Sequence, residues 1–256
     1  MVLLLTNDDG IDSLGIWALK KALDKEHQVW VVAPEGDRSG TSHSLTFRDP
    51  VRFKKLEHQV YSCNGTPADC VFYTFLGAIA VKPDMIISGI NRGPNLGTDI
   101  LLSGTAAAAR QAALCGVPGV AVSAVAEDDE KPLPFEYAAE FIQGNLLEFY
   151  NLWNRHHFIN INVPSPGVKV PGVSITHPSV RVYTSKIDRY TAPNGDTYVF
   201  LVPQRLRAMD EEGSDWNAIT AGNISVSPVY LHPLNQDEDQ AYLEAEFRKP
   251  KHERRF

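Results

Sequence analysis

Two acidic residues, Asp8 and Asp9, stand side by side where an apolar segment, residues 2–5, has just ended, with Thr6 and Asn7 in between. That segment is typical of a buried strand, and residues 13–23 have the spacing of an amphipathic helix with Ser13 near its cap. In an open α/β sheet, ligands bind beyond the carboxyl ends of the strands. Two carboxylates there repel each other unless a cation or proton lies between them. Because hard divalent cations take oxygen ligands, the pair indicates a metal site. The alternative is that one aspartate caps the helix and the other faces water.

Two further polar loops, 35–46 and 89–102, also follow predicted strands. Both are rich in glycine and small polar residues, which allow the backbone to approach a ligand closely. A long glycine-rich connection between a strand and a helix is uncommon without a functional reason. In the second loop, Asn91 and Asn95 could offer oxygens to a metal or amide donors to a phosphate. The alternative for Asn91 is that it holds a tight turn.

Small and hydroxyl-bearing residues, Ser103, Gly104 and Thr105, begin an alanine-rich helix that runs to Leu114. Free N–H groups at a helix start, together with two hydroxyls, suit an anion such as phosphate. The alternative is that Ser103 and Thr105 only cap the helix.

Other chemistries fit less well. The chain has acidic residues where the dinucleotide fingerprint needs Gly-x-Gly-x-x-Gly, and it has neither a P-loop nor a Gly-x-Ser-x-Gly elbow. His43 could act as an acid or donate a hydrogen bond to a phosphate, although a plain surface histidine is more common. The three cysteines, Cys63, Cys70 and Cys115, have no zinc-knuckle spacing. We interpret them as buried thiols in a reducing compartment.

The elements that position these residues alternate strand and helix. Because strands separated by helices pair in parallel through right-handed crossovers, the fold class is α/β: a doubly wound, mostly parallel, Rossmann-like three-layer sheet. The predicted strands are 2–6, 28–34, 84–88, 119–123 and 158–163, and the predicted helices are 13–23, 66–80, 103–114 and 135–153.

The pattern changes after Pro164, where no further strand–helix alternation follows. We expect a single domain over 1–256, with an α/β core over 1–165 and a hairpin-rich extension and C-terminal arm over 166–256. A projecting β-hairpin with unpaired edges predicts burial in an oligomer, and a surface flap is the alternative. The extension is divided into an extended segment 173–186, a turn 193–196, strands 197–202 and 224–231 around a polar stretch 214–223, and a charged tail 235–256.

The composition supports a globular protein: 43% of the 256 residues are hydrophobic, and the net charge is -7. The negative charge disfavours duplex nucleic acid and anionic membranes as partners. No apolar run approaches the ~20 residues that span a bilayer, and no signal-peptide pattern is visible. We therefore expect a cytoplasmic protein.

Several ordered motifs resemble those of the SurE survival-protein family. They are Leu-Leu-Thr-Asn-Asp-Asp-Gly-Ile at 4–11, Val-Val-Ala-Pro at 31–34, Arg-Ser-Gly at 38–40, Gly-Thr-Pro-Ala-Asp-Cys-Val at 65–71, Ser-Gly-Ile-Asn at 88–91, Gly-Pro-Asn-Leu-Gly at 93–97 and Ser-Gly-Thr-Ala-Ala-Ala at 103–108. The chain departs from the family pattern at Val2, at residues 12–15 and at Leu102. The resemblance implies a metal-dependent nucleotidase that releases phosphate from nucleoside 5′- and 3′-monophosphates and, in some members, from short polyphosphate.

The resemblance also implies roles for individual residues. One Mg²⁺ or Mn²⁺ ion per subunit would be held by Asp8, Asp9, Ser39 and Asn91, and either aspartate could orient the attacking water. The phosphate pocket would be lined by Asn95, Ser103, Gly104 and Thr105. The family is typically a homodimer or homotetramer that exchanges C-terminal segments. The rival hypotheses are a metal-dependent glycosyl- or nucleotidyl-transferase and a non-catalytic nucleotide sensor.

Overall fold

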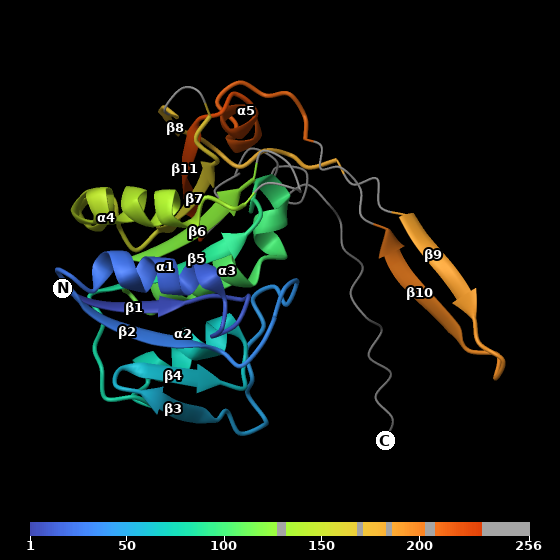
Figure 1. The fold of residues 1–256 in the computed structure, drawn as a ribbon, viewed down its shortest axis with the longest axis horizontal. Helices are drawn as coiled ribbons and strands as arrows, with labels where there is room; N and C mark the ends of the chain where they lie inside the picture. The colour runs from blue at the N-terminus through green and yellow to red at the C-terminus, as the bar shows by residue number, and fades with distance from the viewer. Residues whose placement is uncertain (127–131, 168–170, 183–185, 203–207, 232–256) are drawn as a thin grey trace, which may run out of the picture.

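A twisted, mostly parallel sheet lies between two layers of helices (Figure 1). The computed structural model describes residues 1–126, 132–167, 171–182, 186–202 and 208–231. The sheet has nine strands in the order β3-β4-β2-β1-β5-β6-β7-β11-β8, so the predicted fold class is confirmed. Their bounds are β1 Val2–Thr6, β2 Gln28–Pro34, β3 Phe53–Glu57, β4 Val60–Cys63, β5 Met85–Arg92, β6 Gly119–Val125, β7 His157–Pro164, β8 Val173–Ile175 and β11 Ile224–Tyr230.

The strands of the sheet centre are buried on both faces, as expected of parallel strands covered by helices. In β1, Leu3 and Leu5 face one apolar cluster and Leu4 faces another, all three fully buried. The first cluster packs against α1 (Leu14–Leu23) and α4 (Phe135–Leu152), and the second against α2 (Pro67–Phe75) and α3 (Gly104–Leu114). Strand β1 is therefore held rigidly, and so are the residues that follow it.

The chain changes direction across the sheet beside β1. Strand β2 pairs in parallel with one side of β1, whereas β5 pairs in parallel with the other side. Such a reversal is the topological switch point at which open α/β sheets bind ligands. Residues that follow β1 and those at the end of β5 meet there, as the sequence predicts.

Two elements differ from the sequence-based expectation between the second strand and α3. The segment 53–63 forms an antiparallel pair, β3 and β4, at the sheet edge, where no strand was predicted. Helix α2 ends at Phe75 rather than near residue 80, because Gly77 adopts a left-handed conformation with φ +96°. Its start is as expected, with Pro67 at the first position and a capping box formed by Thr66 and Asp69.

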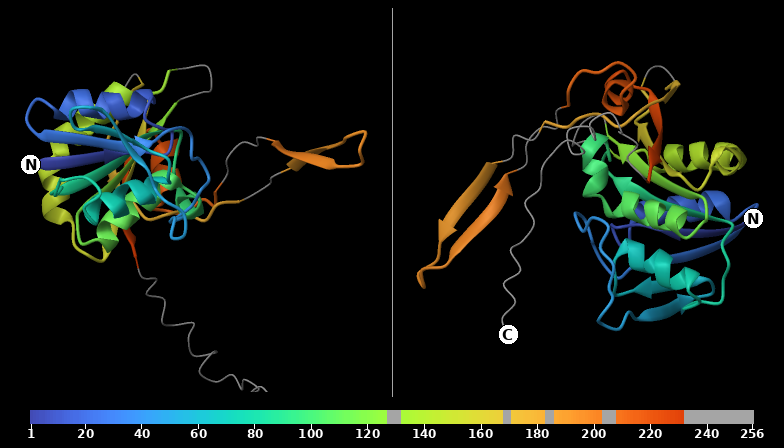
Figure 2. Two further views of the ribbon diagram at one scale, coloured as in Figure 1. Left: turned by 90° about the horizontal axis from the view of Figure 1, so that it is seen from below. Right: turned by 180° about the vertical axis from the view of Figure 1, so that it is seen from behind.

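The later part of the chain contributes to the sheet as well as to a projection. We expected the core to end near residue 165, yet β8 and β11 join the same sheet, with β11 antiparallel to β7. The polar stretch 214–223 contains a short helix, α5 (Asp215–Thr220), that was not predicted. The predicted hairpin is present as β9 (Lys186–Thr191) and β10 (Thr197–Val202), and it extends away from the sheet (Figures 1 and 2). The charged tail 235–256 lies outside the described residues.

Candidate functional site

The carboxylate of Asp8 is buried against the start of helix α3. The backbone N–H of Thr105 donates to Asp8 Oδ2 at 3.1 Å, and the Thr105 hydroxyl donates to Asp8 Oδ1. Asp8 is 4% exposed and Thr105 is fully buried. Burial raises the pKa of Asp8, and the two bonds from Thr105 counteract that shift only in part. The first predicted metal ligand thus lies beside the predicted phosphate pocket.

Asp9 lies next to the end of β5. Its Oδ2 accepts a hydrogen bond from the backbone N–H of Arg92 at 3.2 Å, so one carboxylate oxygen is held in place. Burial and, second, the negative charge of Asp8 raise the pKa of Asp9 to about 6. Two neighbouring carboxylates that both resist ionisation favour a bound cation, which would offset their mutual repulsion.

Ser39 is held by its near neighbour Asp37. Asp37 Oδ1 accepts from the Ser39 backbone N–H at 2.7 Å and from the Ser39 hydroxyl at 2.6 Å. These two bonds lower the pKa of Asp37, so it is a carboxylate at neutral pH. The hydroxyl proton of Ser39 therefore points at Asp37, and the lone pairs of its oxygen point elsewhere.

Asn91 belongs to strand β5 and not to the following loop, because the strand continues to Arg92. The pairing register between β5 and β6 shifts between Ser88 and Asn91, so the strand end is displaced from a regular ladder. The Asn91 amide Nδ2 donates to the carbonyl of Gly93 at 2.9 Å. With its nitrogen committed to that bond, the amide oxygen is free to face a ligand.

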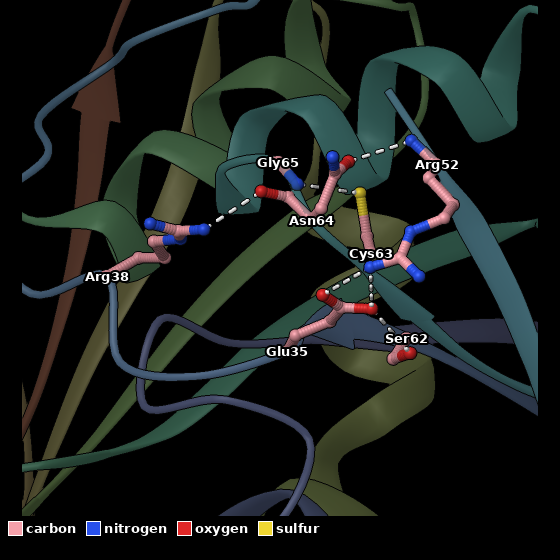
Figure 3. Close-up of polar contacts among 7 residues, drawn as sticks. All are labelled: Glu35, Arg38, Arg52, Ser62, Cys63, Asn64 and Gly65. Carbon is pink, nitrogen blue, oxygen red and sulfur yellow. Dashed lines mark hydrogen bonds and ion pairs between the residues drawn. The ribbon is translucent and has the colours of Figure 1, made fainter. Parts of the chain in front are cut away.

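The loop that carries Ser39 is tied down at several points. The Arg38 backbone N–H donates to the Asp8 carbonyl at 2.7 Å, which holds the loop against the residues after β1. The Arg38 guanidinium donates to the carbonyl of Asn64 at 2.9 Å, and Asn64 is in turn bonded to Arg52 (Figure 3). Arg52 also binds both carboxylate oxygens of Glu35, at 3.0 and 2.9 Å (Figure 3). Both ends of the segment 35–39 are thereby fixed.

The predicted phosphate-pocket residues at the start of α3 differ in what their polar groups already bind. Ser103 caps α3, since its hydroxyl accepts from the Ala106 N–H at 3.0 Å, and the donors of Thr105 bind Asp8. Gly104 is required by space: a Cβ there would lie 2.8 Å from the Asp8 Cβ and 3.1 Å from the Pro67 Cγ. Together with Asn95, these residues remain predicted phosphate ligands, and capping accounts for the hydroxyl of Ser103.

Asn95 is tied to the neighbouring strands instead of to the two aspartates. Its Nδ2 donates to the Ser123 hydroxyl at 3.1 Å, and its N–H donates to Asn162 Oδ1 at 2.8 Å. Asn160 and Asn162 both donate to its carbonyl. This network fixes the chain between β5 and α3, and it leaves the Asn95 amide oxygen for a further partner.

His43 is neither a plain surface residue nor bonded to the carboxylates. Its Nε2 lies 2.8 Å from Gln111 Oε1 on α3, and burial lowers the pKa of the imidazole. His43 therefore fastens the loop 35–46 to α3. Among the cysteines, Cys63 and Cys70 are buried and Cys115 is partly buried, and none of the three forms a disulfide.

A cavity of about 1120 Å³ opens beside Asp9. Its wall includes Asp9, Asp37 and Arg92, together with apolar side chains such as Trp17 and Phe135. A small molecule in this cavity would contact Asp9, the one proposed site residue on its wall.

The donor set fits a hard divalent cation. Asp8, Asp9, Ser39 and Asn91 offer oxygen only, which is the preference of Mg²⁺ and Mn²⁺ and not of softer metals. Each residue makes a hydrogen bond that orients its oxygen: Asp8 with Thr105, Asp9 with Arg92, Ser39 with Asp37 and Asn91 with Gly93. Within the described part of the chain, no group of three or more His, Cys, Asp or Glu side chains could hold a metal. A site here thus depends on the neutral oxygens of Ser39 and Asn91.

Asp37 is the residue that the sequence analysis missed. The spacing Asp-x-Ser is typical of an aspartate that accepts hydrogen bonds from a residue two positions later, and it could have pointed to Asp37. The fold and the site together define a class: an open α/β protein with a set of oxygen donors that fits a cation and a helix N-terminus at the sheet's switch point.

The chain belongs to the SurE family, since the model of the family described as survival protein SurE matches residues 3–185. A protein of Geotalea uraniireducens named 5′-nucleotidase SurE is 37% identical over 245 residues, covering 92% of this chain and 95% of its own. A protein of the same name from Thermosipho africanus is 38% identical over 243 residues, covering 93% of this chain and 94% of its own. The crystal structure of the SurE protein from Aquifex aeolicus superimposes with a TM-score of 0.79 at 34% identity, covering 96% of this chain and all of the other.

Proposed function

We propose that this protein is a metal-dependent phosphomonoester hydrolase that releases phosphate from nucleoside 5′- and 3′-monophosphates. The observation that carries the proposal is the bonding of Asp8 to Thr105, because it joins the cation ligands to the start of α3. A phosphate at that helix start would lie beside the cation. The names of the relatives, 5′-nucleotidase SurE, support the same reaction.

Asp8, Asp9, Ser39 and Asn91 would hold one Mg²⁺ or Mn²⁺ ion. When bound, the ion would neutralise phosphate charge and lower the pKa of a water molecule. The start of α3 would face one side of the phosphate. The Asn95 amide, whose Nδ2 has a second N–H besides the one donated to Ser123, would donate to a further phosphate oxygen. Asp9, with one oxygen held by Arg92, has its second oxygen available to orient the attacking water. The cavity beside Asp9 offers space for the leaving group.

We further propose that the protein is a homo-oligomer assembled through the β9–β10 hairpin. The hairpin exposes a run of large apolar side chains, among them Tyr190, Phe200 and Leu201, the last of which is 70% exposed. Such a two-stranded ribbon gains stability when another subunit covers it. The compartment is a separate point. The free thiols favour a reducing compartment, which agrees with a cytoplasmic protein.

No helix among the described residues is long and apolar enough to cross a membrane.

The test is phosphate release from a panel of 5′- and 3′-nucleoside monophosphates, tripolyphosphate and p-nitrophenyl phosphate. Each substrate is assayed with Mn²⁺, with Mg²⁺ and with a chelator, alongside Asp9→Asn as the inactive control. Metal-dependent release from nucleotides that is lost in Asp9→Asn supports the proposal. Full turnover by Asp9→Asn would refute the ligand assignment. Nucleotide binding without release would favour a sensor, and transfer to an added alcohol in preference to water would favour a transferase.

A further inference from the structure

We infer that Asp37 is a positioning residue for the cation site: it holds the Ser39 hydroxyl so that the oxygen lone pairs face the metal. This inference rests on the proposed function only in so far as a divalent cation binds at Asp8 and Asp9. It concerns a residue that lies outside the four proposed ligands.

The first observation is the pair of hydrogen bonds between the two side chains. A serine hydroxyl is a neutral metal ligand, and it binds a cation through a lone pair while its proton points away. In this structure, the proton is directed at Asp37 Oδ1 over 2.6 Å, and the Ser39 N–H binds the same oxygen at 2.7 Å. The side chain and the backbone of Ser39 are thus both fixed by one carboxylate oxygen.

The second observation is the location of Asp37 relative to the aspartate pair. Asp37 lines the same cavity as Asp9 and Arg92, although it belongs to the loop after β2. That loop is fastened to Asp8 by the Arg38 N–H, one residue away. The Asp37 carboxylate therefore adds negative charge on the side of the cavity where Asp9 would bind the cation.

The alternative is that Asp37 only stabilises its own turn. In that case its removal would lower loop stability and weaken cation binding only through the loss of one solvent-screened charge, as Asp12→Asn would. Partners that orient metal ligands have a larger effect, and their mutation typically costs about 10- to 100-fold in affinity. Cation binding without substrate therefore separates the two roles.

The experiment is a titration of the full-length, metal-free protein with Mn²⁺, in which free Mn²⁺ is measured by electron paramagnetic resonance. Asp37→Ala removes both the acceptor and the charge, and we expect about 10- to 100-fold weaker Mn²⁺ binding. Asp37→Asn keeps an oxygen acceptor for Ser39, so its loss should be less than about tenfold. The matched control is Asp12→Asn, another aspartate on the wall of the same cavity. It changes the charge alone, and screening by solvent should keep its effect within about twofold.

A double-mutant cycle decides whether Asp37 acts through Ser39. In a Ser39→Ala background, Asp37→Ala should weaken Mn²⁺ binding no more than Asp12→Asn does. Equal Mn²⁺ affinities for Asp37→Ala and Asp12→Asn, with both proteins folded by circular dichroism, would overturn the inference. If the wild type does not bind Mn²⁺, both the role of Asp37 and the metal dependence of the proposed function are refuted. Normal Mn²⁺ binding without phosphate release would contradict the proposed function alone.

Discussion

Thr105 donates two hydrogen bonds, from its N–H and its hydroxyl, to the carboxylate of Asp8, a residue 97 positions earlier in the chain. One fully buried side chain thereby fixes the orientation of a proposed metal ligand and the start of α3 at once. The predicted free anion site at this helix start is therefore partly occupied by a carboxylate of the protein itself. Any ligand that binds there does so next to Asp8.

Removing the Thr105 hydroxyl should release Asp8 from this orientation. We expect Thr105→Val to lower kcat/KM for nucleotide hydrolysis by about 10- to 100-fold, since it removes a partner that orients a ligand. The buried carboxylate would lose a donor, so the free energy of unfolding should fall by about 1–3 kcal/mol. Thr105→Ser is the control, because it keeps the hydroxyl and should retain activity within about threefold. Equal activities for the two variants would contradict the role of this bond.

The pKa of Asp9, raised to about 6, makes both stability and metal binding depend on pH. In the metal-free folded protein, Asp9 is still protonated at pH values above 3.8, the pKa of an unperturbed aspartate. Between these two values the folded state binds more protons than the unfolded state, so stability falls as the pH rises from about 4 to about 6. Urea unfolding of metal-free protein across this range should show that slope, and Asp9→Asn should reduce it.

Mn²⁺ must displace the same proton, so its affinity should increase as the pH rises to about 6 and level off above it. Titrations of Mn²⁺ at several pH values measure this directly. A constant affinity between pH 5 and pH 8 would contradict the assignment of Asp9 as a ligand with a raised pKa.

Gly104 should not tolerate a side chain. In Gly104→Ala the new Cβ would lie 2.8 Å from the Cβ and 3.0 Å from Oδ2 of Asp8, so the carboxylate must move. We expect kcat/KM to fall at least about tenfold with the protein still folded, because displacing a catalytic geometry by a fraction of an ångström is costly. Gly144→Ala is the control, since this exposed glycine of α4 has no atom within 4 Å of its added Cβ. It should leave activity unchanged and stabilise the helix by about 0.5–1 kcal/mol.

The hairpin should determine the oligomeric state. Leu201→Asp places a charge in the exposed apolar run of β10, and we expect it to lower the mass measured by light scattering after gel filtration to that of a monomer. Leu147→Asp is the control, because Leu147 is 65% exposed on α4, far along the chain from the hairpin. A wild-type monomer, or an unchanged mass for Leu201→Asp, would contradict assembly through this hairpin.

The alternation of elements and the position of the aspartate pair were predictable because they depend on local patterns. Buried strands and amphipathic helices can be recognised by their apolar periodicity, and Asp8 and Asp9 follow such a strand closely. The edge strand β3 lacks this pattern, because four of its five residues are exposed and three of them, Lys54, Lys55 and Glu57, are charged. Helix α5 was missed because it is only six residues long and begins among polar residues.

The sequence by itself determined which residue types are available to bind a cation and a phosphate, and on which strand ends they stand. Only the tertiary structure decided how they are oriented. The bonds from Thr105 to Asp8, from Arg92 to Asp9 and within the network around Asn95 join residues far apart in the chain. Hydrogen bonds of this kind depend on how β1, β5 and α3 pack, and packing is a property of the whole sheet that no local pattern encodes.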